Sequence, residues 1–88
     1  MKVAEFEKKV WDLDGVRVVI RAATSEKVAD YTNKNAVNKG TSVTEYLTKR
    51  IGPLIDPYTA VVVGGAGNVV NGKTLINSVR ESYKKDNK

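Results

Sequence analysis

The clearest alternation of apolar and polar residues runs from Val16 to Ala22, where every second residue is apolar and two of the three residues between are arginines. This period of two is typical of a strand with one buried face. The pair Asp14-Gly15 precedes it, and Asp-Gly is favoured in the tight turn of a β-hairpin, where both positions take positive φ. We therefore predict an N-terminal β-hairpin with strands within residues 3–13 and 16–22.

A capping signal predicts a helix in the middle of the chain. Residues 42–45 read Ser-Val-Thr-Glu, a capping box in which the serine hydroxyl and the glutamate carboxylate accept hydrogen bonds from free backbone N–H groups. We expect this helix to run to about Ile51 and to end at Gly52-Pro53, because proline breaks the hydrogen-bond ladder. Residues 25–40 are a second helical candidate, although three asparagines lower their helix propensity.

Two further elements are expected in the second half of the chain. Residues 58–63 are mostly apolar and rich in valine, which is typical of a strand that is buried on both faces and lies at the centre of a sheet. Beyond them, Leu75, Val79 and Tyr83 recur at every fourth position. This spacing predicts a helix over residues 75–85 with Thr74 as its N-cap.

The order of these elements defines the fold class as α+β. The expected architecture has an N-terminal β-hairpin, one or two central helices, a third buried strand and a C-terminal helix, in a two-layer ββαβα-like arrangement. We expect residues 1–88 to form a single small domain, because compact domains rarely fall far below this length.

Part of this order resembles a known family. A hairpin, a helix and a strand, followed by the run Val-Val-Asn-Gly-Lys-Thr-Leu at residues 69–75, look like the ubiquitin-like β-grasp domains, in which a similar run introduces a short helix. The resemblance implies a final strand, but none is visible after Tyr83. The chain also ends in Lys-Asp-Asn-Lys, whereas conjugation in that family needs Gly-Gly.

Composition removes several kinds of chemistry. The chain has no cysteine and no histidine, which excludes disulfides, zinc fingers, Ser-His-Asp and Cys-His catalytic sites and the usual haem ligands. We predict that the protein is not an enzyme and has no cofactor and no metal site. Residues 1–10 lack the apolar core of a signal peptide, and a small secreted domain would usually carry disulfides, so we expect a cytoplasmic location and no membrane partner.

Residues 67–74 match the phosphate-loop pattern GxxxxGK[ST] letter for letter, with Gly67, Gly72, Lys73 and Thr74 at the defining positions. Such loops bind phosphate through backbone N–H groups, the lysine and the dipole of the following helix. Only fourteen residues follow Thr74, too few for the strand that carries the magnesium-binding aspartate of an NTPase. Simple anion binding stays open beside two structural interpretations, a hairpin turn or a glycine-rich connection that allows close packing.

Five residues are candidates for binding a partner. Trp11 is the only tryptophan, and the predicted hairpin places it either in the core or beside Arg17 and Arg21. An exposed aromatic ring beside arginines is typical of a protein-binding hot spot or of a platform on which bases stack. Arg80 and Lys84 lie one turn apart on the C-terminal helix and would form a basic strip.

The overall charge agrees with a binding role but does not select the partner. Fifteen Lys and Arg against ten Asp and Glu give +5, which attracts nucleic acids and acidic proteins alike. We expect a small basic binding protein, of the adaptor, regulator or inhibitor type, that acts through protein–protein interaction, with a second copy of itself as one candidate partner. The alternatives are a nucleic-acid-binding module that uses the basic C-terminal half, and phosphate or nucleotide binding by the Gly67–Thr74 loop.

Overall fold

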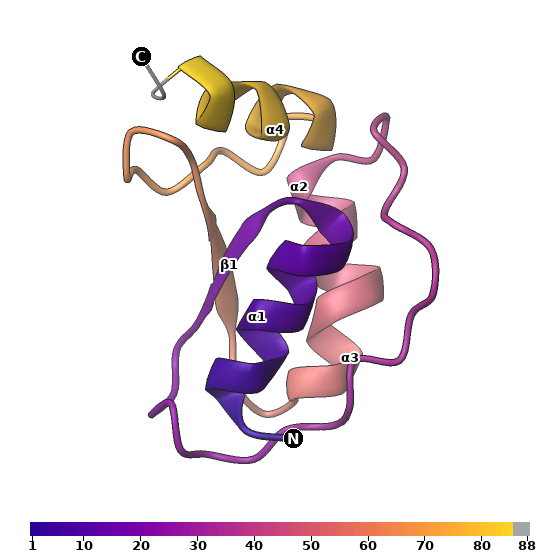
Figure 1. Ribbon diagram of the computed structural model, residues 1–88, viewed down its shortest axis with the longest axis vertical. Coiled ribbons are helices and arrows are strands. Elements are labelled where there is room, and N and C mark those ends of the chain that lie inside the picture. Colours follow the sequence, from indigo (N-terminus) through magenta and orange to yellow (C-terminus); the bar gives the residue numbers. More distant parts are fainter. Residues whose placement is uncertain (86–88) are drawn as a thin grey trace.

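The structure is a computed structural model that describes residues 1–85 (Figure 1). Its elements, in chain order, are α1 (Val3–Asp14), β1 (Arg17–Ile20), α2 (Val43–Glu45), the π-helical η1 (Tyr46–Ile51), α3 (Gly52–Ile55), β2 (Ala60–Val63) and α4 (Ile76–Lys85). The elements α2, η1 and α3 follow one another directly and form one helix, which we call the central helix. The predicted α+β class is confirmed.

The helices cover one face of a small antiparallel sheet. β1 and β2 pair from Arg17 opposite Val63 to Ile20 opposite Ala60. α1 packs against β1, and the η1 part of the central helix packs against β2. α4 lies across one end of the strands, at the top of Figure 1. The core between these layers is built mainly from valine, isoleucine, tyrosine and phenylalanine side chains of all the elements and of the 21–42 segment.

The predicted N-terminal hairpin is wrong, because residues 3–14 form a helix. Val3, Phe6, Val10 and Asp14 are all buried, and their spacing of three to four residues places them on one helical face. Gly15 takes the left-handed conformation (φ 71°), and its N–H donates to the carbonyl of Trp11. The Asp-Gly pair therefore ends a helix, as a glycine after a last helical turn commonly does, and forms no hairpin turn.

Residues 21–42 form an extended segment, so the predicted helix over residues 25–40 is wrong. Its backbone bonds to distant parts of the chain: Val3 N–H donates to the carbonyl of Glu26, and Val28 N–H donates to that of Met1. The side chains of Tyr31 and Val37 are buried and anchor the segment to the core. Contacts far along the chain thus outweigh the local helix propensity, which the asparagines had already lowered.

The central helix starts where the capping box predicts, but it does not end at Pro53. The hydroxyl of Ser42 accepts a hydrogen bond from the N–H of Glu45. Before the proline the helix widens into π-type turns, and the N–H of Gly52 donates to the carbonyl of Leu47, five residues back. A proline ring normally clashes with the carbonyl four residues before it, and the wider turn gives that ring room. The helix can therefore continue to Ile55.

The last two predicted elements are present close to the expected positions. α4 begins at Ile76, one residue later than predicted, so Leu75 and not Thr74 directly precedes the helix. β2 covers residues 60–63, but only Val62 is buried, so the prediction of a strand buried on both faces is wrong. The segment after β2 folds back on it, because Val69 bridges to Val63 and the N–H of Val70 donates to the carbonyl of Val62. With a helix in place of the first strand, the described chain lacks the hairpin that the β-grasp resemblance requires.

The wide turn of the central helix yields a test of its packing. A helix propensity scale alone predicts that Gly52→Ala stabilises the protein by about 1 kcal/mol. We expect the opposite, a loss of about 1–3 kcal/mol in the free energy of unfolding measured in urea, because overpacking carries costs of that size. The new methyl group would lie 2.8 Å from the backbone carbonyl oxygen of Leu47, which cannot rotate away.

Gly40→Ala is the matched control for this substitution. Its added carbon would approach only the side-chain oxygen of Asn38, at 3.3 Å, and we expect a change below about 0.5 kcal/mol. A Gly52→Ala protein more stable than the wild type would show that the close approach to Leu47 costs nothing.

Candidate functional site

Four valines share the face of the sheet that the helices do not cover. Side chains alternate between the two faces of a strand, so Val19 and Val61, which pair with each other, lie opposite the buried Val18 and Val62. The next row on the same face contains Arg17, Val63 and Val69. We call the set of Val19, Val61, Val63 and Val69 the valine face.

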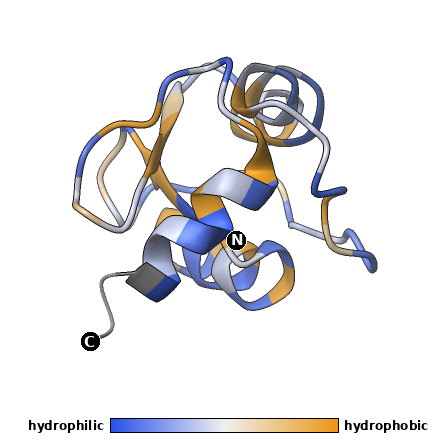
Figure 2. Cartoon of the chain, turned by 90° about the horizontal axis from the view of Figure 1, so that it is seen from above, coloured by the Kyte–Doolittle hydropathy of each residue, from blue (hydrophilic) through white to orange (hydrophobic). Residues whose placement is uncertain are grey.

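The valine face is accessible to solvent. Val19 is 42% exposed and Val69 is 60% exposed, while Val61 and Val63 are partly exposed. Figure 2 colours the chain by hydropathy, and the valines of β1 and β2 that lie outside the core are as hydrophobic as those inside it. Single exposed valines are ordinary on protein surfaces, but a contiguous group is typical of an interaction site.

An aromatic cluster lies at one end of the valine face. Trp11, at the last turn of α1, is 40% exposed, and its ring meets that of Tyr83 edge to face with centroids 5.2 Å apart. The guanidinium carbon of Arg17 lies 5.0 Å from the centroid of the Trp11 ring, a cation–π contact. We call Trp11, Arg17 and Tyr83 the aromatic cluster. The sequence-based hypothesis that Trp11 is exposed beside an arginine agrees with this geometry.

Tyr83 connects the cluster to the sheet itself. Its hydroxyl accepts a hydrogen bond from the N–H of Arg17 (2.7 Å) and donates one to the carbonyl of Val63 (2.6 Å). Arg17 and Val63 are paired residues, so the hydroxyl lies between the strands where a direct backbone bond would otherwise form. Burial raises the pKa of the Tyr83 phenol, which keeps the hydroxyl protonated and able to donate.

The other predicted binding residues do not form one basic surface. Arg21 is exposed at the end of β1, and its N–H donates to the carbonyl of Thr59, which continues the register and places it on the side of Arg17. Arg80 is engaged inside the fold, because its guanidinium donates to the carbonyls of Asp14 (2.8 Å) and Val37 (2.9 Å). Lys84 is exposed on α4, 3.5 Å from the carboxylate of Glu81. The expected basic strip is thus divided.

Several N–H groups of the 67–74 loop are hydrogen-bonded within the fold. The N–H of Gly67 donates to the carbonyl of Gly64, and the N–H groups of Lys73 and Thr74 donate to the side chain and the carbonyl of Asn71. A phosphate loop needs such groups directed at its ligand.

The helix that follows the loop is also engaged. The N–H groups of Ile76 and Asn77, at the start of α4, donate to carbonyls of the 39–41 segment. Gly72 packs against Thr44, whose hydroxyl occupies the space that a side chain at position 72 would need. The geometry favours the interpretation of this loop as a glycine-rich connection that allows close packing.

A second site, which the sequence did not suggest, is a buried polar cluster around Asp14. The Asp14 side chain is fully buried, and its two oxygens accept hydrogen bonds from the hydroxyls of Tyr31 and Tyr46 (2.7 Å for Tyr46), the N–H of Val37 (2.9 Å) and Arg50 Nη2 (3.0 Å). We call Asp14, Tyr31, Tyr46 and Arg50 the buried cluster. The signal for it was the helical spacing of Asp14 from Val10, which the hairpin interpretation concealed.

The buried cluster is fully hydrogen-bonded. Arg50 Nε donates to the Tyr31 hydroxyl (2.7 Å), and Arg50 Nη2 also donates to the carbonyl of Asn35. Burial and the hydrogen bond to Asp14 raise the pKa of Tyr31 to about 12, and the same two causes raise the pKa of Tyr46 above its ordinary value. Both phenols are thus held as neutral donors. With its carboxylate occupied, the cluster stabilises the fold and presents no free base.

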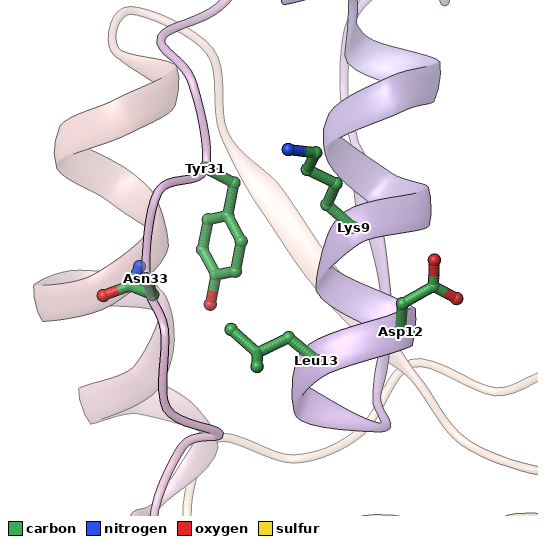
Figure 3. Close-up of a pocket in the computed structure, with 5 residues that line it drawn as sticks. All are labelled: Lys9, Asp12, Leu13, Tyr31 and Asn33. Carbon is green, nitrogen blue, oxygen red and sulfur yellow. The ribbon is translucent and has the colours of Figure 1, made fainter.

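A surface hollow of about 270 Å³ lies beside the buried cluster, lined by Lys9, Asp12, Leu13, Tyr31 and Asn33. Figure 3 shows Lys9 directed toward Tyr31 and the carboxylate of Asp12 directed away from it. Tyr31 itself is only 3% exposed. The hollow therefore brings no acid and base together, and we assign it no reaction.

Comparison of the chain with protein-family models, curated proteins and solved structures finds no match. Within residues 1–85, no group of three or more Asp, Glu, His or Cys side chains is placed to hold a metal ion. No helix in that part of the chain is long and apolar enough to cross a membrane.

The buried cluster yields a prediction for stability. Asp14→Asn removes the charge that pairs with Arg50, and breaking a buried ion pair on one side typically costs about 3–5 kcal/mol. We expect a loss of that size in the free energy of unfolding in urea. Asp12→Asn on the same helix is the control, because Asp12 meets Lys8 at the surface and such pairs contribute at most about 1 kcal/mol. Equal effects of the two substitutions would contradict a stabilising role for the cluster.

A second prediction concerns alkaline pH. The pKa of Tyr31 is about 12 in the folded protein and near 10 in the unfolded chain, so above pH 10 the unfolded state loses a proton that the folded state keeps. The stabilising contribution of Tyr31 is therefore complete below pH 10 and is lost as the pH rises toward 12. The two-unit difference corresponds to about 3 kcal/mol.

The free energy of unfolding, measured on both sides of pH 10, checks this expectation. Above pH 10, the free energy of unfolding of Tyr31→Phe should fall less steeply with pH than that of the wild type. Lysine deprotonation affects both proteins alike. Tyrosinate absorbance from all four tyrosines in a chain that is still folded at pH 11 would contradict it.

Proposed function

We propose that the protein is a non-enzymatic protein-binding module that docks through the valine face and the adjoining aromatic cluster. The observation that carries this proposal is the grouping of four valines on a sheet face that the helices leave open, with Val69 60% exposed. Burial of apolar surface is the main driving force of protein association. An adaptor, regulator or inhibitor can act through such a surface, and the cysteine-free sequence supports the cytoplasm as its location.

The aromatic cluster supports a protein partner. Tryptophan, tyrosine and arginine are the residues most enriched at binding hot spots, and all three meet at the end of the valine face. Their mutual contacts hold the rings and the guanidinium in place before a partner arrives, which lowers the entropy lost on binding.

A second copy of the chain is the less favoured partner. Pairing of two identical valine faces around a twofold axis would bring Arg17 and Arg21 of each copy against a surface of the same charge. Like charges across an interface oppose association. We therefore favour a different protein as the partner of the valine face. Analytical ultracentrifugation would reveal self-association as a sedimenting mass above that of one chain.

Nucleic-acid binding is the second candidate, because Arg17 over Trp11 offers a surface on which a base can stack. The rest of the basic C-terminal half supports it less. Arg80 is hydrogen-bonded inside the fold, and Lys84 lies near Glu81. Binding of nucleic acid depends strongly on phosphate contacts, for which this divided arrangement is poorly suited.

Photo-crosslinking in cells that express the chain distinguishes these functions. A photoreactive phenylalanine analogue at position 69 should form an adduct with one protein of defined mass. The same residue at position 77, exposed on α4, should not. Val19→Glu should abolish the adduct while leaving the fold intact, because Val19 is 42% exposed and such substitutions change stability by about 0.5 kcal/mol.

Two results would contradict the proposal. Adducts of equal yield and composition from positions 69 and 77 would show that the valine face is not a docking surface. An adduct sensitive to nuclease would move nucleic-acid binding to first place.

A further inference from the structure

A hollow of about 390 Å³ adjoins the valine face at the end that carries the aromatic cluster. Its lining consists of Arg17, Val63, Gly64, Gly65, Gly67 and Tyr83. Two of these, Arg17 and Val63, are paired across β1 and β2, so the hollow continues the row of side chains on the open face of the sheet. A partner that covers the valine face would therefore also cover this hollow.

Arg17 brings an unpaired positive charge to the hollow. Among residues 1–85, its guanidinium forms neither an ion pair nor a hydrogen bond, whereas Nε and Nη2 of both Arg50 and Arg80 donate hydrogen bonds within the fold. The centroid of the Trp11 ring lies 5.0 Å from the guanidinium carbon of Arg17. This cation–π contact orients the guanidinium without using its N–H donors. These donors form a planar fork that matches the two oxygens of a carboxylate.

The turn at residues 64–67, which lines the hollow, leaves space for a ligand but offers no free N–H group from Gly65 or Gly67. Gly67 has a φ of 83°, and open space surrounds the position of an added side chain there. The N–H groups of Gly65 and Gly67 are used by the Ser82 hydroxyl and the Gly64 carbonyl. One cation without an amide cradle matches a singly charged group, whereas sites for phosphate dianions usually gather several donors.

From this geometry we infer that the hollow binds a carboxylate of the partner protein. The partner segment would place an aspartate or glutamate on Arg17 and apolar side chains on the valine face. This inference rests on the proposed docking function and adds the chemistry of the partner to it. The valines select against nucleic acid, whose backbone would bring charge to apolar side chains. The net charge of +5 favours an acidic protein as well.

Peptide titration followed by amide NMR tests the inference. The probes are acetyl-Val-Val-Glu-Val-Val-amide and the same peptide with glutamine in place of glutamate. We expect the glutamate peptide to bind about three- to tenfold more tightly and to shift the amides of residues 64–67 together with the Arg17 Nε signal. Arg17→Gln should abolish this preference, and Lys49→Gln, an equal change in charge on the central helix, should retain it.

The outcomes separate this inference from the proposed function. If both peptides shift the valine face with equal affinity, the carboxylate site is wrong and the docking surface stands. If neither peptide shifts the valine face at millimolar concentration, both are wrong. Inorganic phosphate that binds more tightly than the glutamate peptide, or a preference that survives Arg17→Gln, would also overturn the inference.

Discussion

The Asp14 carboxylate is the point at which three parts of the chain are joined. It lies at the end of α1 and accepts hydrogen bonds from two residues of the extended 21–42 segment and two of the central helix. That extended segment has no regular hydrogen-bonded structure of its own, so its position depends on such contacts and on its buried side chains. A buried carboxylate is costly unless all of its hydrogen-bond donors are present. We therefore expect the contacts of α1, the 21–42 segment and the central helix with Asp14 to form together.

The described helices pack so that one face of the sheet stays open. Two helical elements are enough to cover one side of a sheet with two regular strands, and α4 is used at the strand ends, where Tyr83 joins Arg17 to Val63. Nothing in the described chain remains to cover Val19 and Val69. The exposed apolar surface therefore follows from where the described helices pack.

Sequence reasoning succeeded where the deciding interaction is local. The hydroxyl of Ser42 caps the next turn, and the alternation from Val16 onward reflects one buried face. It failed where a distant contact decides. Asp14-Gly15 fits a hairpin turn and a helix end equally well. The helix is favoured by the burial of Val10 and Asp14 on one face and by the distant donors Tyr46 and Arg50, which the Asp14 carboxylate meets there. Pro53 stops a regular helix but not one that has already widened.

For the candidate site, the sequence left Trp11 either in the core or beside Arg17 and Arg21, and the structure has it exposed beside Arg17. The predicted hairpin placed Trp11 and Arg17 on adjacent strands, whereas they meet across the αL turn that joins α1 to β1. The sequence predicted Tyr83 only as part of the apolar face of α4. Its hydrogen bonds to both strands could not be predicted, because they depend on how α4 crosses the strand ends. The Trp11 ring contacts both the Arg17 guanidinium and the Tyr83 ring. The only tryptophan of the chain stands between the guanidinium and the phenol, so its fluorescence should report, without any label, whatever approaches this edge.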